Sequence, residues 1–171
     1  MTPDNIIIRN ETEADITAIA ALTEAAFASL EISNHTEQFI IAALRAAKVL
    51  TISLVAEADG IVVGHVAFSP VRIADGAAGW FGLGPVAVLP ERQRQGIGTA
   101  LIHEGLARLR ALHAKGCCLV GHPAYYTRFG FRNVSGLFHA GVPPEVFFAL
   151  SFDGCLPQGE VSFHEAFHAA A

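Results

Sequence analysis

Apolar positions in the first fifty residues recur at the spacing expected of helices. A short β-branched run spans residues 5–9, and Thr12 followed by Asp15 three positions later is typical of a helix start. The apolar positions that follow predict a helix from Glu13 to about Phe27 with one buried face. A second helix is predicted from Glu37 to Ala47, with residues 29–36 as the loop between the two helices.

The pattern then changes to that of strands. Residues 50–58 (LTISLVAEA) and 61–71 (IVVGHVAFSPV) are strand-like, and Asp59-Gly60 between them is a strong signal for a two-residue hairpin turn. A turn at 74–79 precedes a further strand at 80–88. Three antiparallel strands are therefore expected before residue 90.

Shorter elements are expected in the second half of the chain. A helix containing Leu101 to Leu112 is predicted to end at Lys115-Gly116 by glycine capping, and residues 117–121 to form a strand covered on both faces. Residues 123–129 predict a short helix, and residues 131–135 a last central strand. Two more strands are predicted at 146–152 and 159–167, joined by a turn at 153–158.

Composition favours one compact domain over residues 1–171. Apolar residues make up 52% and charged residues 16%, and the net charge of -5 argues against a nucleic-acid partner. No basic segment leads into an apolar stretch at the N-terminus, and no uncharged run is long enough to span a membrane, so a cytoplasmic location without a membrane partner is expected. The three cysteines are expected to be reduced, buried thiols.

The segment PERQRQGIGTALI at 90–102 places two glycines at the start of a predicted helix. The first N–H groups of a helix attract anions, and glycines allow close approach, so a phosphate is the expected ligand. A dinucleotide-binding loop would need a third glycine where Leu101 stands, and a Walker A loop would need Lys followed by Ser or Thr. An ordinary strand-to-helix turn is the alternative that the two glycines alone leave open.

A larger pattern adds to this. LGPVAVLPERQRQGIGTALI resembles the acetyl-CoA-binding motif of the GNAT superfamily of N-acetyltransferases, with Gln93, Gly96 and Gly98 at its key positions. AYYTRFGF is similar to a second motif of the superfamily, with Tyr126, Gly130 and Phe131 in place. With its FHEAF tail, the chain looks most similar to the predicted acetyltransferases of the YhbS type.

The resemblance implies an α+β GNAT fold. Its centre would be a mostly antiparallel mixed sheet of about six to seven strands, flanked by about four helices and splayed between the fourth and fifth strands. The motifs fall within a core of about residues 5–136, and the C-terminal strands within about 137–168.

The resemblance also implies acetyl-CoA as co-substrate, direct acetyl transfer to a primary amine in a ternary complex, and no metal. Arg92 and Arg94 are candidates for the ribose phosphate of CoA. The residues implied in CoA binding are Val86, Ala87 and Val88 along the pantetheine arm, Gln93, Arg94, Gln95, Gly96, Ile97, Gly98 and Thr99 at the pyrophosphate, and Tyr126 and Phe129.

Two catalytic roles follow from the resemblance. The backbone N–H of Val86 would stabilise the oxyanion, and Tyr126 would protonate the departing thiolate, with Tyr125 as the adjacent competitor. Many relatives carry a basic carboxylate at the position that Gly82 occupies here, so the general base is undetermined. The candidates are Glu31, His35, Glu37 and His122.

Other interpretations stay open. Residues 164–168 spell HEAFH, the zinc signature of metalloproteases, although only three alanines follow it and no helix cap precedes it. A non-catalytic module that binds acyl-CoA is the second alternative, motivated by Gly82. The amine acceptor is undetermined, the chain would be a monomer or homodimer, and residues 138–152 would cap the acceptor pocket or form a dimer contact.

Overall fold

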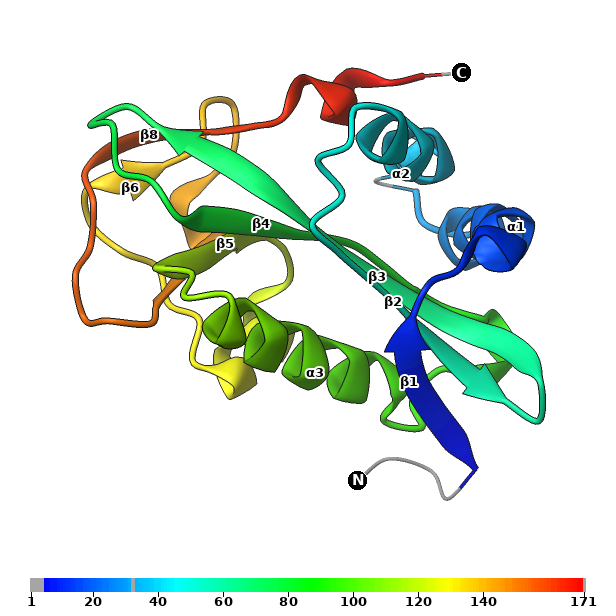
Figure 1. The fold of residues 1–171 in the computed structure, drawn as a ribbon. Coiled ribbons are helices and arrows are strands. Elements are labelled where there is room, and N and C mark those ends of the chain that lie inside the picture. Colours follow the sequence, from blue (N-terminus) through cyan, green and yellow to red (C-terminus); the bar gives the residue numbers. More distant parts are fainter. Residues whose placement is uncertain (1–4, 32, 171) are drawn as a thin grey trace.

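An eight-stranded mixed sheet runs through the centre of the protein (Figure 1). The computed structural model describes residues 5–31 and 33–170, so Ile32 in the predicted loop 29–36 lies outside the described residues. The strand order is β1-β2-β3-β4-β5-β7, and β8 pairs with both β3 and β6. The strands are β1 Ile6–Asn10, β2 Ile52–Ala58, β3 Ile61–Ile73, β4 Trp80–Val88, β5 Gly116–Val120, β6 Leu137–Phe138, β7 Phe147–Ser151 and β8 Gly159–Phe163.

In the part of the chain that the structure describes, four α-helices flank the sheet, as expected. A 3-10 turn, η1 (Glu13–Asp15), leads into the first helix, and there the Thr12 N–H donates to the Asp15 carboxylate at 2.7 Å. The remaining 3-10 turns are η2 Pro90–Arg92, η3 Thr127–Phe129, η4 Pro144–Val146 and η5 Glu165–His168. The helices are α1 Ile16–Phe27, α2 Glu37–Ala46, α3 Ile97–Ala111 and α4 Pro123–Tyr126.

The hairpin between β2 and β3 forms where the sequence predicts it. Asp59 and Gly60 have φ of 50° and 80°, the two left-handed residues that a type I′ turn requires. The alternation along β2 then assigns its two faces. Leu54 lies in the core with Leu101 of α3, whereas Val55 lies in a second core with Ile19 of α1.

Helix α3 ends differently from the prediction. The reversal occurs at His113, which is left-handed (φ 61°), and the Ala114 N–H donates to the Leu109 carbonyl at 3.0 Å in a Schellman pattern. Gly116 is instead the first residue of β5. A Cβ atom there would lie 2.4 Å from the Trp80 ring, so packing rather than capping requires this glycine.

The predicted strand at 131–135 is wrong. Only Arg132 bridges to Ala149, and the Asn133 side chain donates to the Pro144 and Phe147 carbonyls at 3.0 and 2.9 Å. These side-chain bonds hold the segment in place of a ladder, and β6 follows it instead. The described residues 5–31 and 33–170 contain eight strands, close to the six to seven or so that the resemblance implied.

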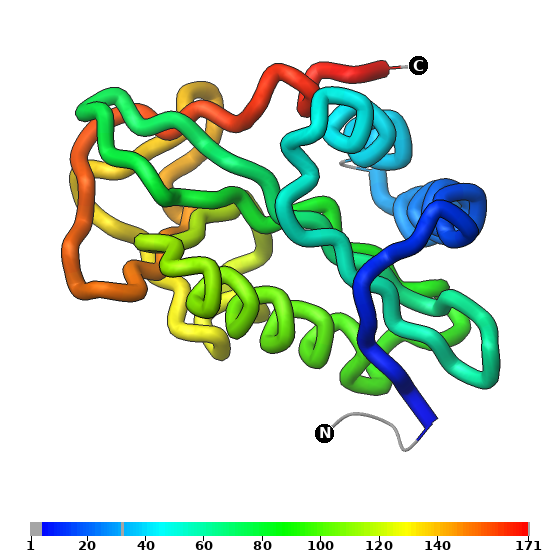
Figure 2. The backbone as a smooth tube through the Cα atoms, viewed as in Figure 1, coloured from blue at the N-terminus to red at the C-terminus, as the bar shows by residue number. Residues whose placement is uncertain are grey.

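The predicted strand at 159–167 ends early. β8 stops at Phe163, and the His164 ring accepts from the Ala166 N–H at 3.0 Å, which starts the 3-10 turn η5. Ala166 then packs against Ile40 and Leu44 of α2. The end of the described chain consequently returns to lie beside α2 (Figure 2).

The cysteines differ in environment. Cys117 and Cys118 are free and buried in β5, and burial raises the pKa of both thiols. Cys155 is free but exposed, so the prediction that all three are buried is wrong for this residue. Within the described ranges 5–31 and 33–170, no helix is long and apolar enough to cross a membrane.

Candidate active site

The sheet opens between β4 and β5, as predicted. The two strands are parallel and pair only from Trp80 with Gly116 to Gly82 with Cys118. On the other side, β4 stays paired with β3, but Gly84 and Pro85 both stand opposite Ala67 because the register shifts there. From Leu83 onward, the edge of β4 that faces β5 is therefore without ladder partners along the described strands.

The glycine loop follows β4 and leads into α3. Gly96 is the N-cap of α3 and is left-handed (φ 83°), a conformation that favours glycine. Arg94 is left-handed as well (φ 63°), which the sequence did not indicate. The two positive φ angles turn the chain into the first turn of the 15-residue helix, whose N–H groups there are free to bind an anion.

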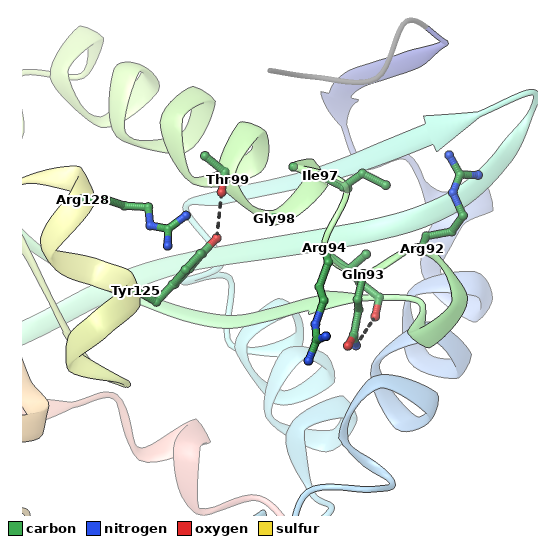
Figure 3. A pocket seen from close by; sticks show the side chains of 10 residues that line it. Arg92, Gln93, Arg94, Ile97, Gly98, Thr99, Tyr125 and Arg128 are labelled. Carbon is green, nitrogen blue, oxygen red and sulfur yellow. Dashed lines mark hydrogen bonds between the residues drawn. The ribbon is translucent and has the colours of Figure 1, made fainter.

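A cavity of about 530 Å³ lies at this helix start, and we call it the loop cavity (Figure 3). Three guanidinium groups line it, from Arg92, Arg94 and Arg128. The remaining lining residues are Val88, Gln93, Gly96, Ile97, Gly98, Thr99 and Tyr125. The chain as a whole is acidic, so this concentration of positive charge is local and suits a phosphate ligand.

The two glutamines of the loop make different contacts. The Gln93 amide donates to the Val88 carbonyl at 3.1 Å and so ties the loop to the end of β4 (Figure 3). Gln95 is exposed and accepts from Arg92 at 3.1 Å. Gln93 thus holds the loop in place through its side chain, whereas Gln95 orients an arginine of the loop cavity.

Tyr125 and Tyr126 line different cavities. The Tyr125 hydroxyl lies 3.2 Å from the Thr99 hydroxyl, and the Arg128 guanidinium stacks 4.6 Å from the centre of the Tyr125 ring (Figure 3). Tyr126 lines a second cavity, of about 630 Å³, together with Val86 and Val120 from the two sides of the opening. Burial raises the pKa of the Tyr126 hydroxyl to about 12.

The second cavity, which we call the splay cavity, is mostly apolar. Its side chains come from the strands at the opening, from α1 and α2, and from the C-terminal segment. Its polar and titratable side chains are Glu37, Tyr126, His139, Ser162 and His168. The apolar residues are Phe27, Ile40, Leu83, Pro85, Val86, Val120, Val142, Phe163 and Phe167, with Gly84 beside them.

Gly82 is buried against the C-terminal segment. A Cβ atom at this position would lie 2.9 Å from Cε1 of Phe163 and 3.2 Å from Cγ1 of Val71. The Phe163 ring thus occupies the space into which a side chain at position 82 would extend. This packing explains why the position implied to carry a basic carboxylate holds a glycine here.

The four candidate bases lie in different places. Only Glu37 lines the splay cavity. Glu31 is exposed on the loop between α1 and α2, and His35 lines a separate cavity of about 270 Å³ beside Glu24 and Gln38. His122 is exposed and accepts from the Ala124 N–H at 3.2 Å as the N-cap of α4.

Two other predicted CoA-binding residues are packed inside. Ala87 is buried against Leu22 and Ala26 of α1. The Phe129 ring is buried 5.3 Å from the Tyr125 ring, edge to face. Each supports the position of a neighbour that lines a cavity.

Several residues of the two cavities could not be assigned from the sequence, and three of them carry charged or titratable side chains. Arg128 lies within AYYTRFGF, so its place among the motif residues was a usable signal. His139 follows β6, and His168 is the last residue of η5. Both reach the splay cavity through long-range strand pairing that a single sequence does not reveal.

The HEAFH segment does not form the helix that a zinc protease needs. His164 precedes the 3-10 turn η5, and its Nδ1 atom is occupied by the Ala166 N–H. In the part of the chain that the structure describes, no three potential metal ligands cluster. HEAFH in this chain therefore caps and forms the 3-10 turn η5 rather than the helix that the zinc signature describes.

The fold and the two cavities define a class of protein. The profile of the acetyltransferase (GNAT) domain matches residues 50–133, and an uncharacterized N-acetyltransferase of Escherichia coli (strain K12), YhbS, is 37% identical over 128 residues, 74% of each chain. The chain belongs to the GNAT family of acetyltransferases, which confirms the resemblance seen in its motifs.

Two solved structures are similar over nearly the whole chain. A GNAT family acetyltransferase from Brucella melitensis, in complex with acetyl-CoA, is 51% identical with a TM-score of 0.86, over 95% of this chain and 97% of that one. The structure of YhbS from Escherichia coli, in complex with CoA, is 31% identical, also with a TM-score of 0.86, over 100% of this chain and 97% of that one. The expected GNAT architecture is thereby confirmed.

Proposed function

We propose that this protein transfers an acetyl group from acetyl-CoA to a primary amine, by direct attack of the amine in a ternary complex. The observation that carries the proposal is the opening between β4 and β5, with the loop cavity and the splay cavity beside it. The Brucella melitensis relative was crystallised with acetyl-CoA, which supports the same co-substrate here.

The residues of the loop cavity fit the phosphates of CoA. N–H groups from Arg94, Gln95, Gly96, Ile97, Gly98 and Thr99 would bind the pyrophosphate at the start of α3. Arg92, Arg94 and Arg128 supply positive charge for it and for the ribose phosphate. The open edge of β4 at Val86, Ala87 and Val88 would pair with the amides of pantetheine.

Acetyl-CoA, when bound, supplies the thioester whose acetyl group is transferred. The Val86 N–H would stabilise the negative charge that develops on the carbonyl oxygen. Tyr126 would donate its proton to the departing sulfur, and its raised pKa keeps the hydroxyl protonated at neutral pH. Both residues line the splay cavity, where the two substrates would meet.

The splay cavity favours an amine with an apolar body. Phenylalanine rings and aliphatic side chains make up most of its described lining, and these residues include no Lys or Arg. Glu37 is the one carboxylate among them, which suits a cationic ammonium group and disfavours an acidic acceptor. Small aralkyl amines such as 2-phenylethylamine are therefore the first acceptors to test.

Calorimetry with acetyl-CoA tests the binding part of this proposal. Gly98 has an ordinary backbone conformation, but a side chain there would project toward Tyr125 and Val88 in the loop cavity. We expect Gly98→Glu to weaken acetyl-CoA binding at least 100-fold, since bulk and negative charge would both oppose the phosphates. Ala107→Glu places the same group on an exposed position of α3 and should leave the affinity unchanged. Equal affinity of both variants would contradict the proposed phosphate site.

A non-catalytic acyl-CoA-binding module is the second candidate, favoured by the absence of a side chain at Gly82. A free-thiol assay over a panel of primary amines separates the two. Release of CoA that depends on the amine supports the enzyme, whereas tight binding of acetyl-CoA without release across the panel supports the module.

A further inference from the structure

We propose that His139 is the general base that removes a proton from the acceptor amine, through its Nε2 atom. This inference rests on the proposed acetyl transfer and adds the group that the sequence leaves undetermined. His139 follows β6 and lines the splay cavity together with Val86 and Tyr126. One cavity therefore holds a histidine, the hydroxyl that would donate a proton to sulfur, and the strand edge that would bind the carbonyl oxygen.

The hydrogen bonding of His139 fixes which ring nitrogen is available. Nδ1 lies 2.7 Å from the backbone carbonyl oxygen of Val161. A carbonyl oxygen only accepts hydrogen bonds, so Nδ1 carries the hydrogen and the lone pair of the neutral ring is on Nε2. The tautomer that a base requires is thus set by β8.

The ring is also held from two sides. Phe163 of β8 meets it edge to face at 4.9 Å between centroids, and Phe147 of β7 lies nearly parallel to it at 6.4 Å. Phe163 is the same ring that fills the space beside Gly82. The side chain that excludes a carboxylate from β4 therefore also positions the histidine.

The other titratable groups facing the cavity are less suited to this role. Both carboxylate oxygens of Glu37, at the start of α2, accept from the Ser33 hydroxyl at 2.8 Å. His168 is exposed at the end of η5, and Tyr126 on α4 holds its proton up to a pKa of about 12. From β7 and β8, only Phe147, Val161, Ser162 and Phe163 face His139 or the cavity, and none of these is charged.

The proposed step is a single proton transfer. One N–H bond of the bound ammonium breaks, its proton goes to Nε2 of His139, and the bonding pair remains on the amine nitrogen as the lone pair that attacks the carbonyl carbon. The histidine becomes an imidazolium with both nitrogens protonated, and it returns the proton to solvent after product leaves.

His139→Asn tests the inference while preserving the fold. The asparagine amide can still donate to the Val161 carbonyl but offers no basic nitrogen. We expect its turnover of 2-phenylethylamine to fall about 100-fold. O-benzylhydroxylamine is an isostere of 2-phenylethylamine whose amine is already neutral at pH 7. With this acceptor, the turnover of His139→Asn should fall only a few-fold. His113→Asn, an exposed left-handed position at the end of α3, is the matched control and should retain wild-type rates.

Two further measurements keep this test independent of overall activity. Acetyl-CoA affinity of His139→Asn by calorimetry should match the wild type. A long-range ¹H–¹⁵N spectrum of the unliganded protein should show His139 as the Nδ1–H form, assigned by the signal lost in the variant. Any of three results would overturn the proposal. These are a hydrogen on Nε2 of His139, an equal loss of turnover in His139→Asn with both amines, and a loss of turnover in His168→Asn instead of in His139→Asn. A wild type that releases no CoA with any amine contradicts the proposed function itself.

Discussion

Tyr125 and Tyr126 show how single residues divide the work of the site. They are neighbours on the four-residue helix α4, so their rings point in different directions. Tyr125 reaches Thr99 beside the glycine loop, whereas Tyr126 turns toward the opening in the sheet. Gly121 makes room for the second ring, because a Cβ atom there would lie 2.3 Å from Cε2 of Tyr126.

This division predicts that removing one hydroxyl lowers kcat, whereas removing the other weakens acetyl-CoA binding. Tyr126→Phe should lower kcat about 100-fold with little change in acetyl-CoA affinity, because only the proton for the departing sulfur is lost. Tyr125→Phe should weaken acetyl-CoA binding by roughly 3- to 10-fold, the value of one hydrogen bond, and affect kcat less. Steady-state kinetics and calorimetry on both variants provide the check. Unchanged kcat in Tyr126→Phe would remove this residue from the acid role.

A partly buried polar cluster joins the elements β1, β2, β3 and α2. Glu11, just after β1, accepts from Arg45 of α2 at 2.8 and 2.9 Å and from the Ser53 hydroxyl. The same hydroxyl lies 2.7 Å from Nε2 of His65, which is fully buried in β3. Burial lowers the pKa of His65 to about 4, against the attraction of Glu11.

The cluster makes stability depend on pH in a defined window. The unfolded chain protonates His65 below its ordinary pKa of about 6.5, whereas the folded chain does so only near 4. The contribution of His65 to the free energy of unfolding should therefore be fully present above pH 7. It should be lost as the pH drops from about 6.5 toward 4, by roughly 3 kcal/mol in total. Glu11 and Asp15, whose pKa values are lowered by Arg45 and Arg9, add losses only at more acidic pH.

Urea unfolding of the wild type and His65→Gln at pH 7.0 and 5.0 isolates this contribution. His65→Gln should have a lower free energy of unfolding than the wild type at pH 7.0. That free energy should change much less between pH 7.0 and pH 5.0 in the variant than in the wild type. If both proteins lost the same free energy of unfolding between pH 7.0 and pH 5.0, the pH dependence would come from groups other than His65.

Elements with a local pattern could be predicted from the sequence, and those formed by distant pairing could not. The hairpin at Asp59-Gly60 follows from turn chemistry, and the loop before α3 from the motif that contains Gly96 and Gly98. The short β6, the end of β8 at Phe163 and the position of His139 depend on pairing between segments more than twenty residues apart. The loop cavity was therefore largely predictable, whereas the titratable lining of the splay cavity was not.

In the whole molecule, the ladder that joins the first four strands to β5 and β7 is short, and it lies at the site. β4 and β5 share three residue pairs, whereas β2 and β3 pair along most of their length. β5 in turn pairs with β7, so the two sides of the sheet meet at this short ladder, through α3, and through a core that β3, β5, β7 and β8 share. A ligand that pairs with the free edge of β4 and binds the loop before α3 would join the two sides.

Hydrogen exchange should report this joining directly. With acetyl-CoA at 100 times its dissociation constant, binding contributes about 2.7 kcal/mol, enough to slow exchange through ligand-releasing openings about 100-fold. We expect the slowing in peptides covering residues 83–89 and 94–99, because their N–H groups would contact pantetheine and pyrophosphate. The peptide covering 52–58 in β2 lies in a fully paired part of the sheet and is the internal control, expected to change much less. Equal slowing in all three peptides would mean that acetyl-CoA stabilises the fold without occupying the opening between β4 and β5.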